Sequence, residues 1–141
     1  DRRRRVRRVI GLDTNVVLRF LAQDDAEQSP IATRVFSELT AEEPGYVSAV
    51  VLVETTWVMA RRYDSSREEI ADVVERLLRS AELIVENAEA TYRALALFRS
   101  GRSVEFSDAL IAMTGKLAGA DETVTFDQRA AKQAGIRLLE H

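Results

Sequence analysis

The 141-residue chain contains no cysteine and only one histidine, His141, at its last position. The absence of cysteine excludes disulfide scaffolds, thiolate nucleophiles, zinc sites of the cysteine type and thiol redox chemistry. A single terminal histidine cannot supply the general acid and base that attack by a ribose 2′-hydroxyl normally needs. Proline and glycine are scarce, at two and six residues, so the composition is not that of a disordered or collagen-like chain.

Long hydrophobic runs are absent as well. The apolar run over residues 49–53 ends at Glu54, far short of the ~20 residues that a membrane span requires. Apolar residues make up 46% of the chain and charged residues 30%, and the length is typical of one domain with one core. We therefore expect a soluble, cytoplasmic protein that has no membrane partner.

Basic and acidic residues are separated along the chain. Residues 1–8 hold six arginines and one aspartate, which leaves 14 basic and 22 acidic residues, a net charge of −8, for the rest. We predict a basic extension over 1–8, one domain over 9–138 and, over 139–141, a Leu-Glu-His end typical of a purification tag. The arginines could bind an RNA backbone, but no aromatic residue is interleaved with them, which favours a flexible extension.

Short apolar runs that favour strands alternate with segments that favour helices. The predicted strands cover residues 9–12, 46–47, 83–85, 122–126 and 136–138. The predicted helices begin at or near Asn15, Ser29, Ser48, Ser66, Asn87, Ser107 and Asp127. This alternation predicts an α/β fold of three layers, α/β/α, with a central parallel sheet of four to five strands. The helix that begins at Ser48 is apolar on almost all sides, so we expect it to be buried.

Four acidic residues stand in apolar surroundings. Asp13 ends the first predicted strand, Glu54 interrupts an apolar helix, Asp108 lies between Phe106 and an apolar run, and Asp127 follows the fourth predicted strand. Ligand sites of parallel sheets form at the carboxyl ends of the strands, so the four acids could converge there. Carboxylates that converge stay ionised only when a cation or a basic side chain neutralises them, and oxygen ligands without histidine or cysteine select Mg²⁺ or Mn²⁺.

Each acid also has an ordinary structural explanation when it is taken alone. Asp13 could form a strand-end turn, Asp108 could stabilise a helix N-terminus, and Asp127 could cap a helix. Glu54 is the least compatible with such an explanation, because a buried apolar helix has no need of a carboxylate.

A magnesium site formed by the four acids would orient a water molecule for attack on a phosphodiester, which is the chemistry of a metal-dependent nuclease.

Four segments carry motifs that occur together in a known family. They are Gly-Leu-Asp-Thr-Asn-Val-Val-Leu-Arg-Phe-Leu at 11–21, Val-Glu-Thr-Thr-Trp-Val at 53–58, Phe-Ser-Asp-Ala-Leu-Ile-Ala at 106–112 and Thr-Phe-Asp at 125–127. In this order they resemble the motifs of PIN-domain ribonucleases, and their flanks are most similar to the VapC toxins of bacterial type II toxin–antitoxin pairs. The resemblance covers the chain from Val9 to about Leu138.

The resemblance implies both a site and an activity. Asp13, Glu54, Asp108 and Asp127 would be the acidic quartet that holds Mg²⁺ or Mn²⁺, with Asn15 and Thr125 as supporting residues. The implied protein is a homodimeric endoribonuclease toxin that leaves 5′-phosphate and 3′-hydroxyl ends on RNA, with tRNA and rRNA as candidate substrates. A cognate VapB-like antitoxin would neutralise it by covering the acidic site.

Alternatives remain for the function and for individual residues. A non-catalytic RNA- or partner-binding protein could retain the same fold without turnover. A receiver domain or an aspartate-nucleophile phosphatase would need a second acid near Asp13, where Thr14 and Asn15 stand instead. Arg19 could reach a substrate phosphate or neutralise a site acid. Trp57 and Phe106 could stack on bases, but their apolar surroundings favour the core.

Overall fold

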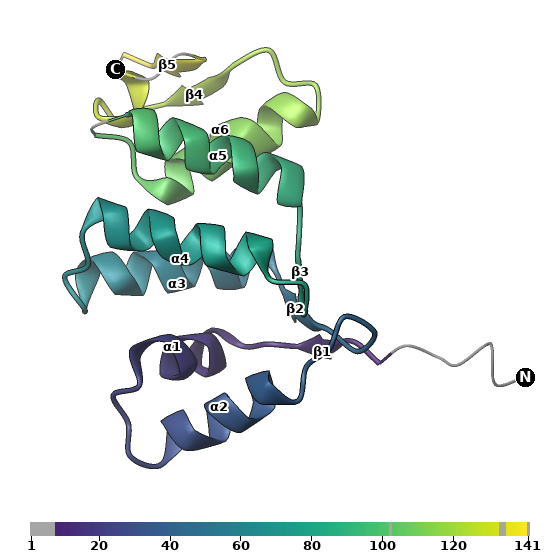
Figure 1. The fold of residues 1–141 in the computed structure, drawn as a ribbon. Helices are drawn as coiled ribbons and strands as arrows, with labels where there is room; N and C mark the ends of the chain where they lie inside the picture. Colours follow the sequence, from purple (N-terminus) through teal and green to yellow (C-terminus); the bar gives the residue numbers. More distant parts are fainter. Residues whose placement is uncertain (1–7, 102, 133–134, 141) are drawn as a thin grey trace, which may run out of the picture. The chain divides into compact units, whose positions relative to one another are not determined.

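The computed structural model describes residues 8–101, 103–132 and 135–140, so most of the predicted basic extension and His141 lie outside the described residues. The chain forms two compact units. The first unit comprises Asp1–Thr55 and Leu77–Glu86, and the second comprises Thr56–Arg76 and Asn87–His141. Figure 1 follows the chain through the elements of both units.

The first unit contains a three-stranded parallel sheet in the order β1 (Ile10–Gly11), β2 (Gly45–Val47) and β3 (Leu83–Val85). Two helices, α1 (Thr14–Ala22) and α2 (Gln28–Ser37), connect β1 to β2. Gly45 lies where the sheet meets the core: a Cβ there would stand 2.8 Å from side-chain atoms of both Leu12 and Leu39. Any larger residue would force these two core leucines apart.

Helices α3 (Ala49–Arg61) and α4 (Arg67–Arg79) connect β2 to β3, and each begins in the way that its sequence predicts. The Val51 amide donates to Ser48 Oγ at 3.1 Å. Before α4, the Glu69 amide donates to Ser66 Oγ at 3.1 Å, and the Ser66 amide donates to Glu69 Oε1 at 2.7 Å. This reciprocal capping box satisfies two amides that the helix itself leaves unpaired.

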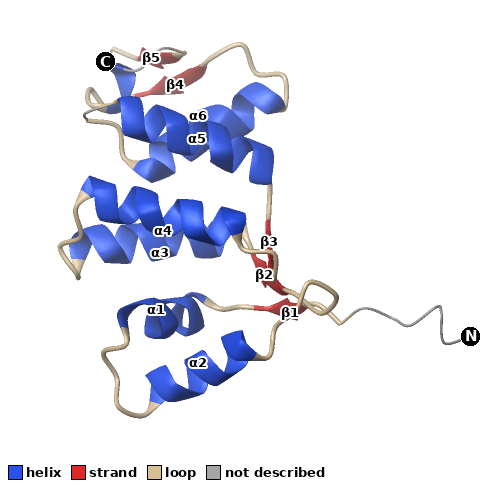
Figure 2. Ribbon diagram, viewed as in Figure 1, coloured by secondary structure: helices blue, strands red, loops and turns tan. Residues whose placement is uncertain are grey.

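The second unit places α5 (Ala88–Ser100) against α6 (Phe106–Leu117). The Phe98 and Phe106 rings meet edge to face with centroids 5.9 Å apart, which makes Phe106 a core residue, as predicted. After α6 come β4 (Thr123–Thr125), the short 3₁₀ helix η2 (Ala130–Lys132) and β5 (Ile136–Leu138). The two strands pair in parallel, as the ribbon in Figure 2 shows.

Helix α3 is not buried on all sides, so that prediction is wrong. Leu52, Thr55 and Met59 are buried, but Val50, Glu54 and Trp57 are exposed, and Trp57 retains 49% of its accessible surface. The exposed residues recur at the spacing of one helix face. Because apolar residues occupy both faces, composition could not distinguish the outward face from the inward one.

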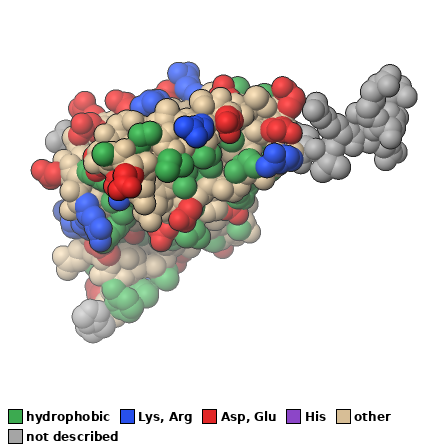
Figure 3. Space-filling view, turned by 90° about the horizontal axis from the view of Figure 1, so that it is seen from below, with side chains coloured by type: hydrophobic (Ala, Val, Ile, Leu, Met, Phe, Trp, Pro, Cys, Tyr) green, Lys and Arg blue, Asp and Glu red, His purple; other side chains and the backbone are tan. Residues whose placement is uncertain are grey.

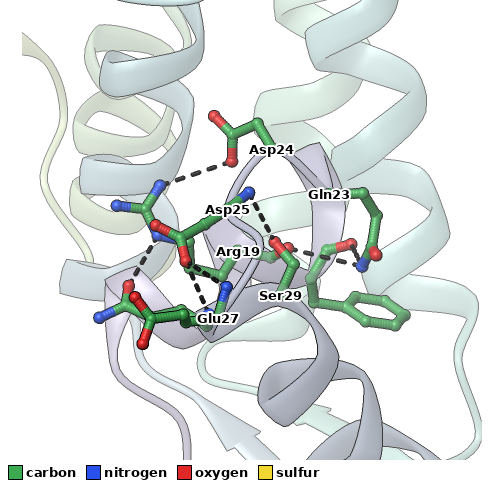
Figure 4. Close-up of polar contacts among 8 residues, drawn as sticks. Arg19, Gln23, Asp24, Asp25, Glu27 and Ser29 are labelled. Atoms are coloured by element: carbon green, nitrogen blue, oxygen red, sulfur yellow. Dashed lines mark hydrogen bonds and ion pairs between the residues drawn. The ribbon is translucent and has the colours of Figure 1, made fainter.

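Asp25 holds the connection between α1 and α2 in place through hydrogen bonds (Figure 4). Its Oδ1 accepts the amides of Glu27 and Gln28 at 3.0 and 2.7 Å, while the Asp25 amide donates to Ser29 Oγ at 3.2 Å. The Gln28 and Glu27 amides hold the pKa of Asp25 below its usual range. The helix therefore begins at Gln28 rather than at Ser29, because a carboxylate three residues upstream caps it.

All five strands of the described residues pair in parallel, and helices alternate with strands along both units, so the predicted α/β class and strand direction are confirmed. On the face drawn in Figure 3, charged side chains of both signs are interspersed with apolar ones. Across the described ranges, no helix is long and apolar enough to traverse a bilayer.

Candidate active site

Asp13 follows the carboxyl end of β1 and occupies the N-cap position of α1. Its backbone is extended, and its carbonyl accepts the amides of Val16 and Val17 at 3.0 and 3.1 Å. The carboxylate makes no capping hydrogen bond and is exposed to solvent. Asp13 rather than Asn15 therefore begins this helix, while its side chain is left available for a ligand.

Glu54 lies beside the first turn of α1. The buried Thr14 hydroxyl donates to Glu54 Oε1 at 2.5 Å, which ties α3 to the residue that follows Asp13. This hydrogen bond fixes the orientation of the Glu54 carboxylate. Glu54 is exposed, so its carboxylate does not carry the cost of burial that the sequence suggested. The first unit thus brings Asp13, Thr14 and Glu54 together.

Asp108 stands in the first turn of α6 and is half-buried. Burial is the main cause that raises the pKa of its carboxyl, and the charges of Asp127 and Glu105 add to this effect. The guanidinium of Arg129 acts in the opposite direction and lowers the pKa of Asp108. Three carboxylates and one guanidinium therefore share this part of the second unit.

Asp127 is held by a compact turn after β4. Its amide donates to Thr125 Oγ1 at 3.0 Å, and its Oδ1 accepts the Arg129 amide at 2.8 Å. Thr125 thus fixes the main chain at Asp127, whose carboxylate is exposed. These two hydrogen bonds leave the second carboxylate oxygen of Asp127 turned to other partners or solvent.

The four predicted site acids are divided between the units. Asp13 and Glu54 belong to the first unit, and Asp108 and Asp127 belong to the second. Over residues 8–101, 103–132 and 135–140, no group of three or more histidine, cysteine, aspartate or glutamate side chains forms a metal-holding cluster. The structure therefore brings the acids together as two pairs, one in each unit.

Arg19 and Asn15 occupy different surroundings. The Arg19 guanidinium donates to Gln28 Oε1 at 2.8 Å and pairs with Asp24 Oδ1 at 3.5 Å, so it holds the connection between α1 and α2 (Figure 4). Asn15 lies in the first turn of α1 and is exposed. Arg19 thus contacts residues of its own helix pair, and Asn15, the residue after Thr14, is exposed to solvent.

Sequence reasoning missed the arginines around Asp108. Arg67 donates to the carbonyl oxygens of Phe98, Val104 and Gly101 at 2.8, 2.9 and 3.3 Å, and its guanidinium carbon lies 4.0 Å from the Phe98 ring centroid. Burial and the charge of Arg129 lower the pKa of Arg67. These hydrogen bonds fix the end of α5 and the loop that leads into α6, the helix that carries Asp108.

One signal of this role is visible in the sequence. Arg67 is the first residue of α4, where the helix dipole disfavours a positive charge and where Glu68 and Glu69 are the expected residues. A cation at such a position needs another partner. Its partners are carbonyl groups at the end of α5 and in the loop before α6, which lie 31 to 37 residues away in the chain.

Comparisons with known proteins show which family the chain belongs to. The PIN domain family matches residues 10–136. A VapC ribonuclease of Aquifex aeolicus is 32% identical over 122 residues, which cover 86% of this chain and 89% of that protein. The crystal structure of Mycobacterium tuberculosis VapC20, described as a sarcin–ricin loop cleaving toxin, is 24% identical, covers 92% of this chain and 98% of that one, and has a TM-score of 0.42. The chain therefore belongs to the PIN-domain family and is of the VapC type.

Proposed function

We propose that this protein is a Mg²⁺- or Mn²⁺-dependent endoribonuclease toxin that hydrolyses RNA phosphodiester bonds to 5′-phosphate and 3′-hydroxyl ends. The observation that carries this proposal is that Asp108 is half-buried and lies beside Asp127 and Glu105, since its burial and these two charges raise the pKa of its carboxyl. Crowded carboxylates outside an apolar core relieve their repulsion when they bind a cation. The 32% identity to a VapC ribonuclease supports RNA as the substrate.

The residues present fit a divalent metal. Asp13, Glu54, Asp108 and Asp127 offer only carboxylate oxygens, the donors that Mg²⁺ and Mn²⁺ prefer. In our proposal these four acids are the ligands of the cation, and Asn15 and Thr125 support Asp13 and Asp127. A bound cation would offset the negative charge of the quartet and stabilise charge that develops on the phosphate oxygens.

The chain's own residues prepare the site. Thr14 donates to Glu54 and orients that carboxylate. Burial and the neighbouring acids raise the pKa of Asp108, and the charge of Arg129 opposes this shift. Thr125 fixes the turn that presents Asp127. Each of these contacts lies within one unit.

Chelation should stop RNA cleavage completely. We expect EDTA to abolish activity and added Mg²⁺ or Mn²⁺ to restore it, because an acidic site without its cation repels phosphate. The downstream fragments should be ligated without prior phosphorylation, as judged by adapter ligation of the products. A 2′,3′-cyclic phosphate on the upstream fragment would contradict the hydrolytic mechanism. Absence of cleavage with either metal would favour the non-catalytic alternative.

We also propose that a cognate VapB-like antitoxin inhibits the enzyme by bringing a basic side chain to the acidic quartet. An arginine suits this role, because its planar guanidinium can bridge two carboxylates. Replacing that arginine with alanine should weaken the complex by about 2–5 kcal/mol, since the carboxylates would be left uncompensated. The alanine variant should still inhibit at low Mg²⁺ and release activity when Mg²⁺ is raised. Inhibition that is insensitive to Mg²⁺ would contradict charge replacement.

The remaining assignments belong to the same proposal. We take residues 9–138 as the nuclease domain and 1–8 as a basic extension, and we expect a homodimer that acts in the cytoplasm, where its RNA is found. Either tRNA or rRNA is compatible with the site. Mapping the ends of RNAs cleaved after induction in cells would decide between them.

A further inference from the structure

The second unit contains a pocket next to Asp108 that the acidic quartet does not use. It has a volume of about 210 Å³, and its wall includes Ser107, the residue that precedes Asp108. Helix α3 contributes Trp57 and Arg61 to the wall, and the turn after Asp127 contributes Arg129. The volume is below the roughly 300 Å³ at which sites begin to enclose drug-sized ligands, so the pocket suits a group the size of one nucleotide unit.

The pocket is positively charged although the body of the chain is acidic. Arg61, Arg67 and Arg129 line it, whereas Glu105 is its only acid. Arg61 pairs with Glu105 through one nitrogen, Nη2, at 3.1 Å, so its other donors remain for a further acceptor. Arg67 donates to uncharged carbonyl groups, which do not cancel its charge. The lining therefore favours an anion.

An exposed aromatic ring stands at the edge of this positive pocket. Trp57 keeps 49% of its accessible surface, and the guanidinium of Arg61 lies 5.8 Å from the centroid of its ring. A half-exposed indole beside guanidinium groups is the combination on which single-stranded nucleic acids bind, with bases stacked on the ring and phosphates held by the cations. A protein segment would gain much less from a lining dominated by arginine.

We propose that this pocket is a subsite for one nucleotide of single-stranded RNA, with its base stacked on Trp57 and its phosphate held by Arg129 and Arg61. The proposal rests on the proposed function in taking RNA as the substrate, and it adds the residues that hold the strand beside the cleaved bond. The backbone amide of Arg129 donates to Asp127 Oδ1 at 2.8 Å. A phosphate bound by Arg129 therefore lies next to a residue of the quartet.

The chain offers a direct test because Trp57 is its only tryptophan. Intrinsic fluorescence of the full-length protein would be followed during titration with a short single-stranded oligoribonucleotide in EDTA, where no cleavage occurs. We expect saturable quenching by this RNA and little change with inorganic phosphate or with an abasic oligonucleotide, which keeps the phosphates but has no bases. Quenching by the abasic strand equal to that by RNA would overturn the stacking contact.

Substitutions separate the two parts of the subsite. Trp57→Leu should weaken binding of a dye-labelled oligoribonucleotide, measured by fluorescence anisotropy, by about 5- to 150-fold, whereas Trp57→Phe should retain most of the affinity. Arg129→Gln should weaken binding and lower the slope of log affinity against log salt by about one. The matched controls are Tyr92→Leu, an aromatic with 46% exposure on α5, and Arg93→Gln, an exposed ion-pair partner of Glu89. Neither control should change the affinity.

The binding assay distinguishes failure of this proposal from failure of the nuclease proposal. RNA that quenches Trp57 but is never cleaved with Mg²⁺ or Mn²⁺ would support the subsite and refute the nuclease. RNA that is cleaved by wild type, Trp57→Leu and Arg129→Gln at equal rates and affinities would refute the subsite alone. Circular dichroism would verify that each variant is folded, which the exposure of both side chains leads us to expect.

Discussion

Replacement of Asp108 by asparagine should abolish RNA cleavage and at the same time make the folded protein more stable at neutral pH. The loss of activity follows from the proposed role of Asp108 as a metal ligand. Loss of a group that only supports a metal ligand typically costs 10- to 100-fold, so loss of a ligand should cost at least about 100-fold. The gain in stability follows from the crowding of Asp108 with Asp127 and Glu105.

The sign of the stability change depends on the direction of the pKa shift. Burial and the neighbouring acids raise the pKa of Asp108, so the folded state holds this proton more tightly than the unfolded state does. The wild type therefore loses stability as the pH rises from about 3.9, the usual pKa of an aspartate, through the raised pKa of the folded state. Asparagine carries no charge at any pH and avoids this loss.

Urea denaturation at neutral and at acidic pH would measure this effect. Asp108→Asn should unfold at a higher urea concentration than wild type at neutral pH, and the difference should disappear below about pH 3, where the wild-type carboxyl is protonated in both states. Asp121→Asn is the control, because it removes the same charge from an exposed bend before β4. Full cleavage activity of Asp108→Asn would contradict the quartet, and equal stability at every pH would contradict the crowding.

Replacement of Arg67 by methionine should destabilise the fold by about 2–4 kcal/mol, because buried carbonyl groups would lose a charged donor. Arg67 donates to Val104 and Phe98, residues that are 0% and 3% exposed, and also to Gly101. Methionine matches the length of the aliphatic stem but offers no hydrogen. Arg67→Lys should have an intermediate effect, since an ammonium lacks the planar fork that reaches several carbonyls.

The free energy of unfolding from denaturant titrations would test the role of Arg67. Arg93→Met is the matched control, because Arg93 forms an exposed ion pair with Glu89 on α5, and its loss should cost less than about 1 kcal/mol. The end of α5 and the loop after it lead into α6, the helix of Asp108. Arg67→Met should therefore also reduce cleavage, in proportion to the fraction of protein molecules in which this segment is unfolded. Stability equal to that of wild type would show that these carbonyls find other partners.

Local features of this fold were readable from the sequence because their partners lie within a few residues. Ser66 and Glu69 cap each other across three positions, and Ser48 caps α3 in the same way. The strand Leu83–Val85 and the helix that ends before Gly101 also lie where the apolar runs and the glycine predict. The starts of α1 and α2 are exceptions: Asp13 rather than Asn15 is the N-cap residue of α1, and Asp25 rather than Ser29 caps α2.

The identity of the four site acids could also be predicted, since each follows or interrupts an apolar segment and matches one motif of the family. Their surroundings could not. Glu54 is exposed because it lies on the outward face of α3, which carries both apolar and polar residues. The residue that donates to it, Thr14, lies 40 residues away in the chain. Asp108 and Asp127 meet because the turn after β4 returns to the start of α6. Which carboxylates crowd one another depends on packing between distant segments.

By itself, the sequence determined the α/β class, the parallel direction of the strands and the family, and it singled out the four acids that we propose as the site, because hydrophobic period, helix capping and short motifs are local properties. Tertiary structure alone decided how Arg67 closes the loop before Asp108 and how Trp57, Arg61 and Arg129 form one positive pocket on an acidic chain. The physical reason is that a guanidinium or an indole acquires its role from the groups brought to it by folding. Which groups surround such a side chain depends on how helices and strands pack together, and not on its neighbours in the sequence.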